Sequence, residues 1–156
     1  DYWYGFGEFE RSISLPRDFT FKLRASGKAT AHRLAATEQI LGGGYATVRG
    51  FDESIIRGDS GFLGTAELIS PPLDFCETLD DTFRFFAFID TAAFDITNPL
   101  PGESSPALTG AGLGVSCRLG DSGFARASYG WALTDCGVSP SLVDDGKFHF
   151  GLSVTY

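Results

Sequence analysis

The sequence lacks long apolar runs, methionine and any excess of basic charge. Its longest unbroken apolar run is five residues, from Phe85 to Ile89, whereas a transmembrane helix needs about 20. The 12 Lys and Arg residues are outnumbered by 20 Asp and Glu, which gives a formal net charge of −8. This balance argues against a broad nucleic-acid surface, so we predict no nucleic-acid partner. Because a primary translation product begins with methionine, we expect this 156-residue chain to be a processed chain, a cut fragment or part of something longer.

The sequence also lacks a catalytic or metal-binding constellation. Its three cysteines show neither CxxC nor Cys/His spacing, so a zinc site is not indicated. The glycine run at 42–44 is not followed by the Gly-Lys-Ser/Thr of a phosphate loop. His32 and His149 have no nucleophile or acidic partner that the pattern would place within hydrogen-bond reach. We therefore predict no enzyme activity, no catalytic residue, no metal and no cofactor.

Aromatic residues are abundant, at 14% with 15 Phe, and they occur in alternating patterns. Apolar and polar residues alternate over segments bounded by Gly and Pro, which predicts β-strands with hairpin-like connections. The fold class predicted is all-β and antiparallel. There are seven such segments, at residues 2–14, 18–31, 61–71, 81–93, 107–119, 123–134 and 147–156.

In five of the segments one face carries no charge. Segment 81–93, for example, has Phe85 and Ile89 on one face and Arg84 and Asp90 on the other. In a soluble barrel the uncharged face would be the core, whereas in an outer-membrane barrel it would meet lipid and the charged face would line a wet lumen. The first segment is an exception, because its aromatic residues share a face with Glu8 and Glu10. We expect a β-bulge near Gly5 or Gly7 to explain this.

Segment and loop lengths favour the membrane. The segments run to roughly ten to fourteen residues, and about nine to eleven tilted residues cross a bilayer, whereas soluble strands average about five or six. Tight turns at 15–17 and 120–122 alternate with long connections at 32–60, 94–106 and 135–146, as is typical of outer-membrane barrels. We therefore predict an antiparallel transmembrane β-barrel in the bacterial outer membrane. The alternative is a soluble β-barrel that binds a small apolar ligand.

The last eight residues resemble the C-terminal signal by which outer-membrane barrels are recognised for assembly. The matching positions are a polar residue, a glycine, a hydrophobic residue and a terminal aromatic: His149, Gly151, Val154 and Tyr156. The resemblance implies that the barrel-assembly machinery is a partner through the C-terminal strand. A terminal aromatic side chain on the lipid side would also suit the interfacial girdle.

The long connection carries four short motifs in one order. They are Thr37-Glu38-Gln39, Gly42-Gly43, Val48-Arg49-Gly50-Phe51 and Gly58-Asp59-Ser60-Gly61. This set resembles the conserved loop of two-partner secretion transporters, the haemolysin secretion/activation proteins, which belong to a superfamily with periplasmic POTRA domains ahead of a barrel. The resemblance covers essentially the whole chain.

In that family the Val-Arg-Gly-Phe/Tyr tip folds into the barrel lumen, and its Arg pairs with an Asp in a Phe-x-Asp-x-Gly strand motif. The resemblance implies the same pairing here for Arg49 and Asp90, in a motif formed by Phe88, Asp90 and Ala92, with Ala where the family more often has Gly. The alternation also places Asp90 on the charged face, and Gly50 permits a sharp turn. A bidentate Arg–carboxylate pair could pin the loop. Glu67 is a second possible partner.

The resemblance implies that residues 1–156 are the C-terminal part, seven or so strands, of an outer-membrane barrel with loop 32–60 inserted in its lumen. The implied function is export of a large secreted partner protein, such as a haemolysin or adhesin, from the periplasm to the exterior. A membrane-protein insertase of the same superfamily is an alternative. Seven strands leave sheet edges that outer-membrane lipid cannot satisfy, so we expect upstream strands, or another chain, to close the barrel.

Overall fold

The structure is a computed structural model that describes residues 2–73, 81–120, 122–136 and 145–155. Seven long strands form one antiparallel sheet, and the predicted all-β fold is confirmed. Each strand begins and ends within three residues of its predicted segment. The strands, in their order across the sheet, are β1 (Gly5–Ser14), β2 (Thr20–Ala29), β5 (Ser60–Ile69), β6 (Asp81–Asp95), β7 (Ala107–Leu119), β8 (Gly123–Cys136) and β9 (Gly146–Val154).

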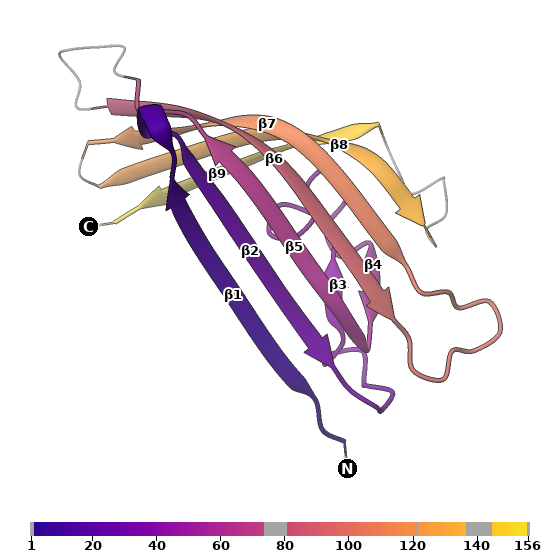
Figure 1. Cartoon of the computed structure of the whole chain (residues 1–156). Coiled ribbons are helices and arrows are strands. Elements are labelled where there is room, and N and C mark those ends of the chain that lie inside the picture. Colours follow the sequence, from indigo (N-terminus) through magenta and orange to yellow (C-terminus); the bar gives the residue numbers. More distant parts are fainter. Residues whose placement is uncertain (1, 74–80, 121, 137–144, 156) are drawn as a thin grey trace.

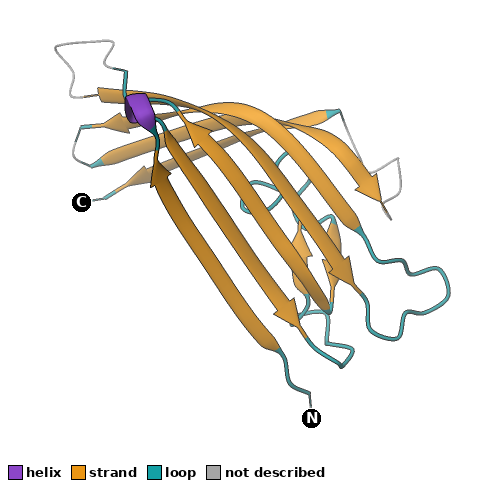
Figure 2. Cartoon of the chain, viewed as in Figure 1, coloured by secondary structure: helices purple, strands orange, loops and turns teal. Residues whose placement is uncertain are grey.

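The sheet is a meander, because each long strand lies beside the long strand that follows it in the chain (Figure 1). A single 3-10 turn, η1 (Pro16–Asp18), joins β1 to β2. The connection from β2 to β5 is different, since it contains a separate two-stranded hairpin of β3 (Ile40–Gly42) and β4 (Ile56–Gly58). Figure 2 shows that the rest of this connection is loop. The hairpin lies on the concave side of the curved sheet (Figure 1).

The concave face of the sheet, which carries charged residues, is buried along β6, and the apolar convex face is exposed. A soluble barrel would bury its apolar face instead. Along β6, Phe86, Phe88 and Asp90 point to the concave face and are buried, whereas Phe85 and Ile89 on the convex face are 50% and 49% exposed. The same exposure recurs on the convex face of other strands, at Phe9, Phe62, Leu68, Leu113, Trp131, Phe148, Phe150 and Leu152. An exposed and mainly apolar convex face is what a lipid-facing wall requires. Arg11, which lies opposite Leu23 in the register, is a charged exception on the convex face of β1.

No α-helix long and apolar enough to cross a membrane occurs among the described residues.

A small apolar core lies between the long loop and the concave face. Its buried members are Val48, Phe51 and Ile56 from the loop and Ala92, Phe94 and Leu108 from β6 and β7. Removing these side chains from water stabilises docking of the loop on the sheet. The concave face is therefore not polar along its whole length, because β6 places its even-numbered Phe residues beneath the loop.

The expectation of a β-bulge in β1 is wrong. The pairing of β1 with β2 runs without interruption from Gly5 opposite Ala29 to Ser14 opposite Thr20. Without a bulge, Phe9 and Ile13 lie on the convex face with Arg11 between them, and Phe6 lies on the concave face with Glu8 and Glu10. The register shift that does occur lies between β7 and β8, next to Gly110.

Candidate functional site

Arg49 lies at the tip of the long loop and is buried against the concave face, with 5% of its surface exposed. Its Nε donates a hydrogen bond to Asp90 Oδ2 at 2.7 Å, and its Nη2 donates to Asp90 Oδ1 at 2.8 Å. The backbone N–H of Arg49 adds a third bond to Asp90 Oδ2, at 3.1 Å. This bidentate geometry fixes both the side chain and the backbone of the loop tip on β6.

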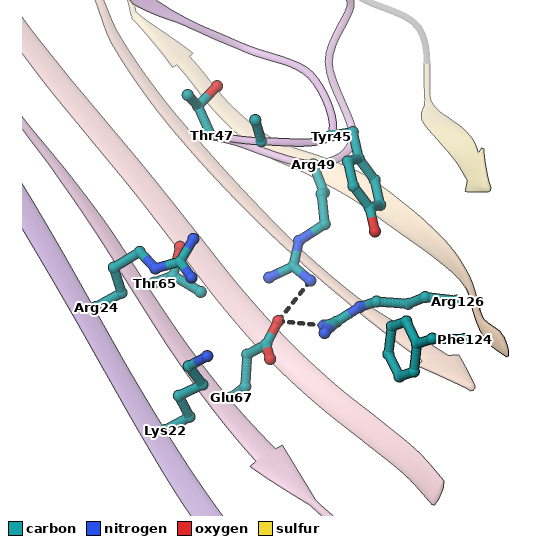
Figure 3. Close-up of a pocket in the computed structure, with 10 residues that line it drawn as sticks. Lys22, Arg24, Tyr45, Thr47, Arg49, Thr65, Glu67, Phe124 and Arg126 are labelled. Carbon is teal, nitrogen blue, oxygen red and sulfur yellow. Dashed lines mark hydrogen bonds and ion pairs between the residues drawn. The ribbon is translucent and has the colours of Figure 1, made fainter. Parts of the chain in front are cut away.

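A second carboxylate, that of Glu67 on β5, contacts the same guanidinium. Arg49 Nη1 donates to Glu67 Oε1 at 2.6 Å, and Arg126 Nη2 from β8 donates to the same oxygen at 2.5 Å (Figure 3). Glu67 is therefore a partner of Arg49 together with Asp90, not in place of it. Two cations and two carboxylates balance in this network, which limits the cost of taking four charges out of water.

Two aromatic rings of β6 lie beneath the two guanidinium groups. Arg49 Cζ is 3.5 Å from the ring centroid of Phe88, and Arg126 Cζ is 3.9 Å from that of Phe86. Such cation–π contacts attract the guanidinium group to the face of the ring, and they strengthen where water is excluded. Two residues of the sequence motif thus contact the same guanidinium in different ways: Asp90 binds its edge, and the ring of Phe88 lies against its face.

Glycines allow the loop backbone to approach β7 and β8 closely. Gly50 has φ of +104°, a conformation that side chains disfavour. A Cβ atom at Gly110 would lie 2.1 Å from the carbonyl oxygen of Arg49, and one at Gly130 would lie 2.6 Å from the Gly50 nitrogen. On the β9 side, the Gly50 N–H donates to His149 Nε2 at 3.4 Å. The loop tip therefore contacts every strand from β5 to β9.

The carboxylate of Asp59 forms a second anchor, at the other end of the loop. Asp59 is fully buried and accepts hydrogen bonds from Gln39 Nε2 at 3.0 Å and from the backbone N–H groups of Leu34 and Thr97 at 2.9 and 2.8 Å. Burial alone would raise the pKa of Asp59, but the three hydrogen bonds outweigh it and the pKa is lowered from its ordinary value of 3.8. Asp59 thus links the start of the loop, the loop itself and the segment after β6.

The remaining loop and strand motif residues pack around this framework. Val48 and Phe51 are buried in the apolar core, as is Ala92, whose methyl group fills a site with 1% exposure. Gly58 and Gly61 lie against Phe94, since a Cβ atom at either would lie 2.7 Å and 2.2 Å, respectively, from atoms of that side chain. Small residues are needed at both positions because β4 and the start of β5 contact β6 directly.

The four residues of the expected assembly signal divide between the two faces of β9. His149 and Gly151 face the loop, and a Cβ atom at Gly151 would lie 3.1 Å from the hydroxyl oxygen of Tyr45. Val154 is on the apolar face and 64% exposed. Tyr156 lies outside the described residues.

The alternation of apolar and polar residues in segment 123–134 predicts that Arg126 lies on the polar face with Ser128, but it does not reveal the ion pair of Arg126 with Glu67. The alternation gave the direction of Arg126, yet the pair joins residues 59 positions apart on strands that are not neighbours. It also missed Phe86, Gly110 and Gly130. The glycines at alternate positions of β7 were a usable signal, because side chains are absent from a strand face where another backbone approaches closely.

The part of the chain that the structure describes contains no group of three or more His, Cys, Asp or Glu residues able to hold a metal ion. The chemistry that the site does offer is electrostatic. Arg49, Glu67, Asp90 and Arg126 form a satisfied network whose members come from one loop and three strands. Such a network can hold a loop in one position, and can release it only by exposing buried charge.

A curved antiparallel sheet with a mainly apolar convex face and an arginine-anchored loop on its concave face is part of a β-barrel fold. A sequence profile described as haemolysin secretion/activation protein ShlB/FhaC/HecB matches residues 2–117. The chain belongs to this family, the outer-membrane β-barrel transporters of two-partner secretion.

Among solved structures, the fold is similar to that of CdiB from Acinetobacter baumannii, with a TM-score of 0.74 and 21% sequence identity. The likeness covers 99% of this chain and 27% of that chain, so the described fold corresponds to about a quarter of the solved protein. A search of curated protein sequences gave no match.

Proposed function

We propose that this chain is the C-terminal part of an outer-membrane pore that exports a large haemolysin- or adhesin-like partner protein from the periplasm to the exterior. Loop 32–60 lies in the lumen of that pore. Membership of the haemolysin secretion/activation family supports transport of a secreted protein. The apolar convex face supports a location in outer-membrane lipid.

The observation that carries the proposal is the attachment of Arg49 to Asp90 and Glu67. Breaking a buried ion pair by removing one partner costs about 3–5 kcal/mol. The loop therefore stays docked in the resting pore, where it narrows the passage and ties β5, β6 and β8 together. Export of a polypeptide requires either that the loop moves or that the chain passes beside it.

Secretion is proposed in preference to the two alternatives. An insertase of the same superfamily would share the arginine loop, but the matching profile is that of secretion/activation proteins. A soluble barrel for an apolar ligand would bury its uncharged face, whereas here residues such as Phe85 and Phe150 are exposed by 50% and 63%.

The sheet edges and the last strand point to further partners. In the described sheet β1 and β9 each have one neighbour, and a membrane strand needs two because lipid offers no hydrogen bonds. We propose that upstream strands of the same polypeptide, or strands of another chain, pair with the free edges of β1 and β9. The barrel-assembly machinery engages β9 and the residues after it. Substituting Val154 by Asp tests this through the amount of protein recovered in outer membranes.

The test of the pore is conductance of the full-length protein in planar lipid bilayers, with Arg49→Ala and Asp90→Ala compared with wild type. We expect discrete channels that both substitutions alter in the same direction, because each removes the same pair. Arg57→Ala is the matched control, since Arg57 is an exposed arginine of the same loop. A protein that folds in plain buffer without detergent, and that gives no conductance, would overturn the proposal.

A further inference from the structure

We propose that the cationic side chains on the concave face beside the short turns bind acidic segments of the polypeptide that the pore exports. We call this set, Lys22, Arg24, Arg84, Arg118 and Arg126, the basic arc. The inference rests on the proposed function, since it assigns a chemical class to the exported chain. It adds a binding surface that is distinct from the anchor of the loop, although Arg126 belongs to both.

The basic arc lies at one end of the sheet. Lys22, Arg84 and Arg126 occur within the first four residues of β2, β6 and β8, and Arg118 is the penultimate residue of β7. The start of β2 follows the short connection 15–19, and the short connection 120–122 joins the end of β7 to the start of β8. The start of β6 follows the connection 70–80 from β5. In the register, Arg84 and Arg126 both pair with Ser116, on either side of β7. Arg84, Arg118 and Arg126 therefore lie near one another on three neighbouring strands. Lys22 and Arg24 lie on β2, on the other side of β5.

The basic arc keeps a net positive charge when the neighbouring carboxylates of Glu10 and Glu67 are counted with it. Glu10 Oε1 pairs with Lys22 at 2.8 Å, while Glu10 Oε2 pairs with Arg24 at 3.1 Å. Glu67 neutralises Arg126 and also contacts Arg49. Among the described residues no carboxylate lies within ion-pair distance of Arg84 or Arg118. A chain with a net charge of −8 thus has a surplus of cations on this part of its inner wall.

Two cavities connect the arc to the tip of the loop. One, of about 390 Å³, is lined by Arg84 and Arg118, and the other, of about 310 Å³, is lined by Lys22 and Arg126 among others. Phe124 borders both cavities, so they adjoin. Figure 3 shows the second cavity, in which cationic side chains from β2, β8 and the loop surround Glu67.

Carboxylates are the ligands that this chemistry selects. Guanidinium groups bind carboxylates through paired hydrogen bonds, and a cleft lined by one sign of charge concentrates the opposite ion. Lipid headgroups are not the source, because the arc is on the concave face and the apolar convex face is the one suited to lipid. An acidic side chain that reaches the second cavity meets Arg49 and Arg126, the donors that Glu67 now uses. Entry of the exported chain thereby competes with one anchor of the loop.

The test is binding of a fluorescently labelled ten-residue glutamate peptide to the full-length protein in detergent micelles, followed by fluorescence anisotropy. The variant is Arg84→Gln/Arg118→Gln, which removes the two cations of the arc that have no carboxylate partner among the described residues. We expect its affinity for the peptide to fall about threefold to tenfold, as two partly exposed charge pairs would give, and the wild-type affinity to fall with added salt. The matched control, Arg57→Gln, should bind as wild type does.

Several results would overturn the inference: equal binding by the double variant and wild type, equal binding of a lysine peptide, or full competition by free glutamate at the same carboxylate concentration. The last result would mean that the arc takes small anions and not a polypeptide segment. Conductance of the same preparations separates the two proposals. Channels without a difference in peptide binding would refute the basic arc alone, whereas charge-specific binding by a protein without channels would refute the pore alone.

Discussion

The carbonyl oxygen of Arg49 lies where a side chain at Gly110 would have to be, because a Cβ atom there would be 2.1 Å away. The neighbour is backbone and is itself held by the three hydrogen bonds of Arg49 to Asp90. The loop tip cannot shift without weakening those bonds. The anchor thus requires glycine at position 110 of β7 as well as the carboxylate of Asp90 on β6.

We expect Gly110→Ala to loosen the loop and to destabilise the folded protein by about 1–3 kcal/mol, as overpacking of a filled site does. Thermal unfolding of the full-length protein in detergent measures the stability, and limited proteolysis within residues 32–60 measures the release of the loop. Gly7→Ala is the control, because a Cβ atom at Gly7 would meet nothing within 4 Å. Equal effects of the two substitutions would mean that strand glycines matter only through backbone entropy.

The two carboxylates that hold Arg49 should differ in importance. Asp90→Asn removes the charge that receives three bonds from Arg49, so we expect a loss of about 3–5 kcal/mol. Glu67→Gln should cost clearly less, because Arg49 keeps its bidentate partner and Arg126 is partly solvated, with 22% of its side chain exposed. Denaturant unfolding of both variants gives the comparison. A larger loss for Glu67→Gln would show that the shared oxygen, not the Asp90 pair, is the principal anchor.

A double substitution separates loop anchoring from stability. Asp90→Leu leaves Arg49 buried beside a hydrocarbon, whereas Arg49→Met/Asp90→Leu removes both charges. We expect the double variant to recover much of the stability that Asp90→Leu loses, because an apolar pair of similar volume often replaces a buried ion pair without loss. Its channels should still differ from wild type if the ion pair positions the loop, and wild-type conductance would contradict that role.

Acid should release the far end of the loop. The pKa of Asp59 is lowered because its hydrogen bonds from Gln39 and from two backbone N–H groups outweigh the effect of burial. The pKa of Glu103 is lowered because of its hydrogen bonds from Arg33. In both cases the unfolded state binds protons more readily than the folded state, so the stabilisation is complete above the unfolded pKa values. This stabilisation is lost as the pH falls below about 4, near the unfolded pKa values, and through the lower pKa values of the two carboxylates in the folded state.

Hydrogen exchange in residues 32–60 at pH 3 and pH 7 measures this release. We expect exchange in the loop to be faster at pH 3, after correction for the intrinsic rate, and Asp59→Asn to show much of that difference already at pH 7. The effect should be weaker for Glu103→Gln, because Arg33 and Glu103 are both partly exposed. Unchanged protection at pH 3 would show that the apolar core around Phe51 holds the loop without Asp59.

The strands could be predicted from the sequence because a period of two is local. Alternation such as that of Phe85 and Ile89 with Arg84 and Asp90 gives both the strand and the face, and a barrel strand needs no information from distant residues for either. The direction of Arg126 followed in the same way. Local alternation could not predict its partner, Glu67, because the curvature that brings β8 near β5 arises from the twist of the whole sheet.

The packing of the loop was also beyond local patterns. Phe86, Phe88 and Phe94 interrupt the polar face of β6, and only their burial beneath Arg126, Arg49 and the loop core explains them. Likewise, the aromatic residues beside the glutamates of β1 suggested a bulge, whereas the register is regular and these aromatics face the concave side. The cause differs between the two strands, because the β6 rings are covered by the loop whereas Phe6 on β1 is 59% exposed.

Two adjacent residues of β1 allow a test of which face of the sheet contacts lipid. Phe9 is on the convex face and 51% exposed, and Glu8 is its neighbour on the concave face, at the same depth in the middle of the strand. Phe9→Arg would place a charge in hydrocarbon, at a cost of about 2–4 kcal/mol near the bilayer midplane. Glu8→Arg changes the net charge by more than Phe9→Arg does, but the new side chain stays in contact with water. We therefore expect only Phe9→Arg to lower folding yield in lipid vesicles, and an equal loss for both variants would mean that the convex face does not lie in the bilayer.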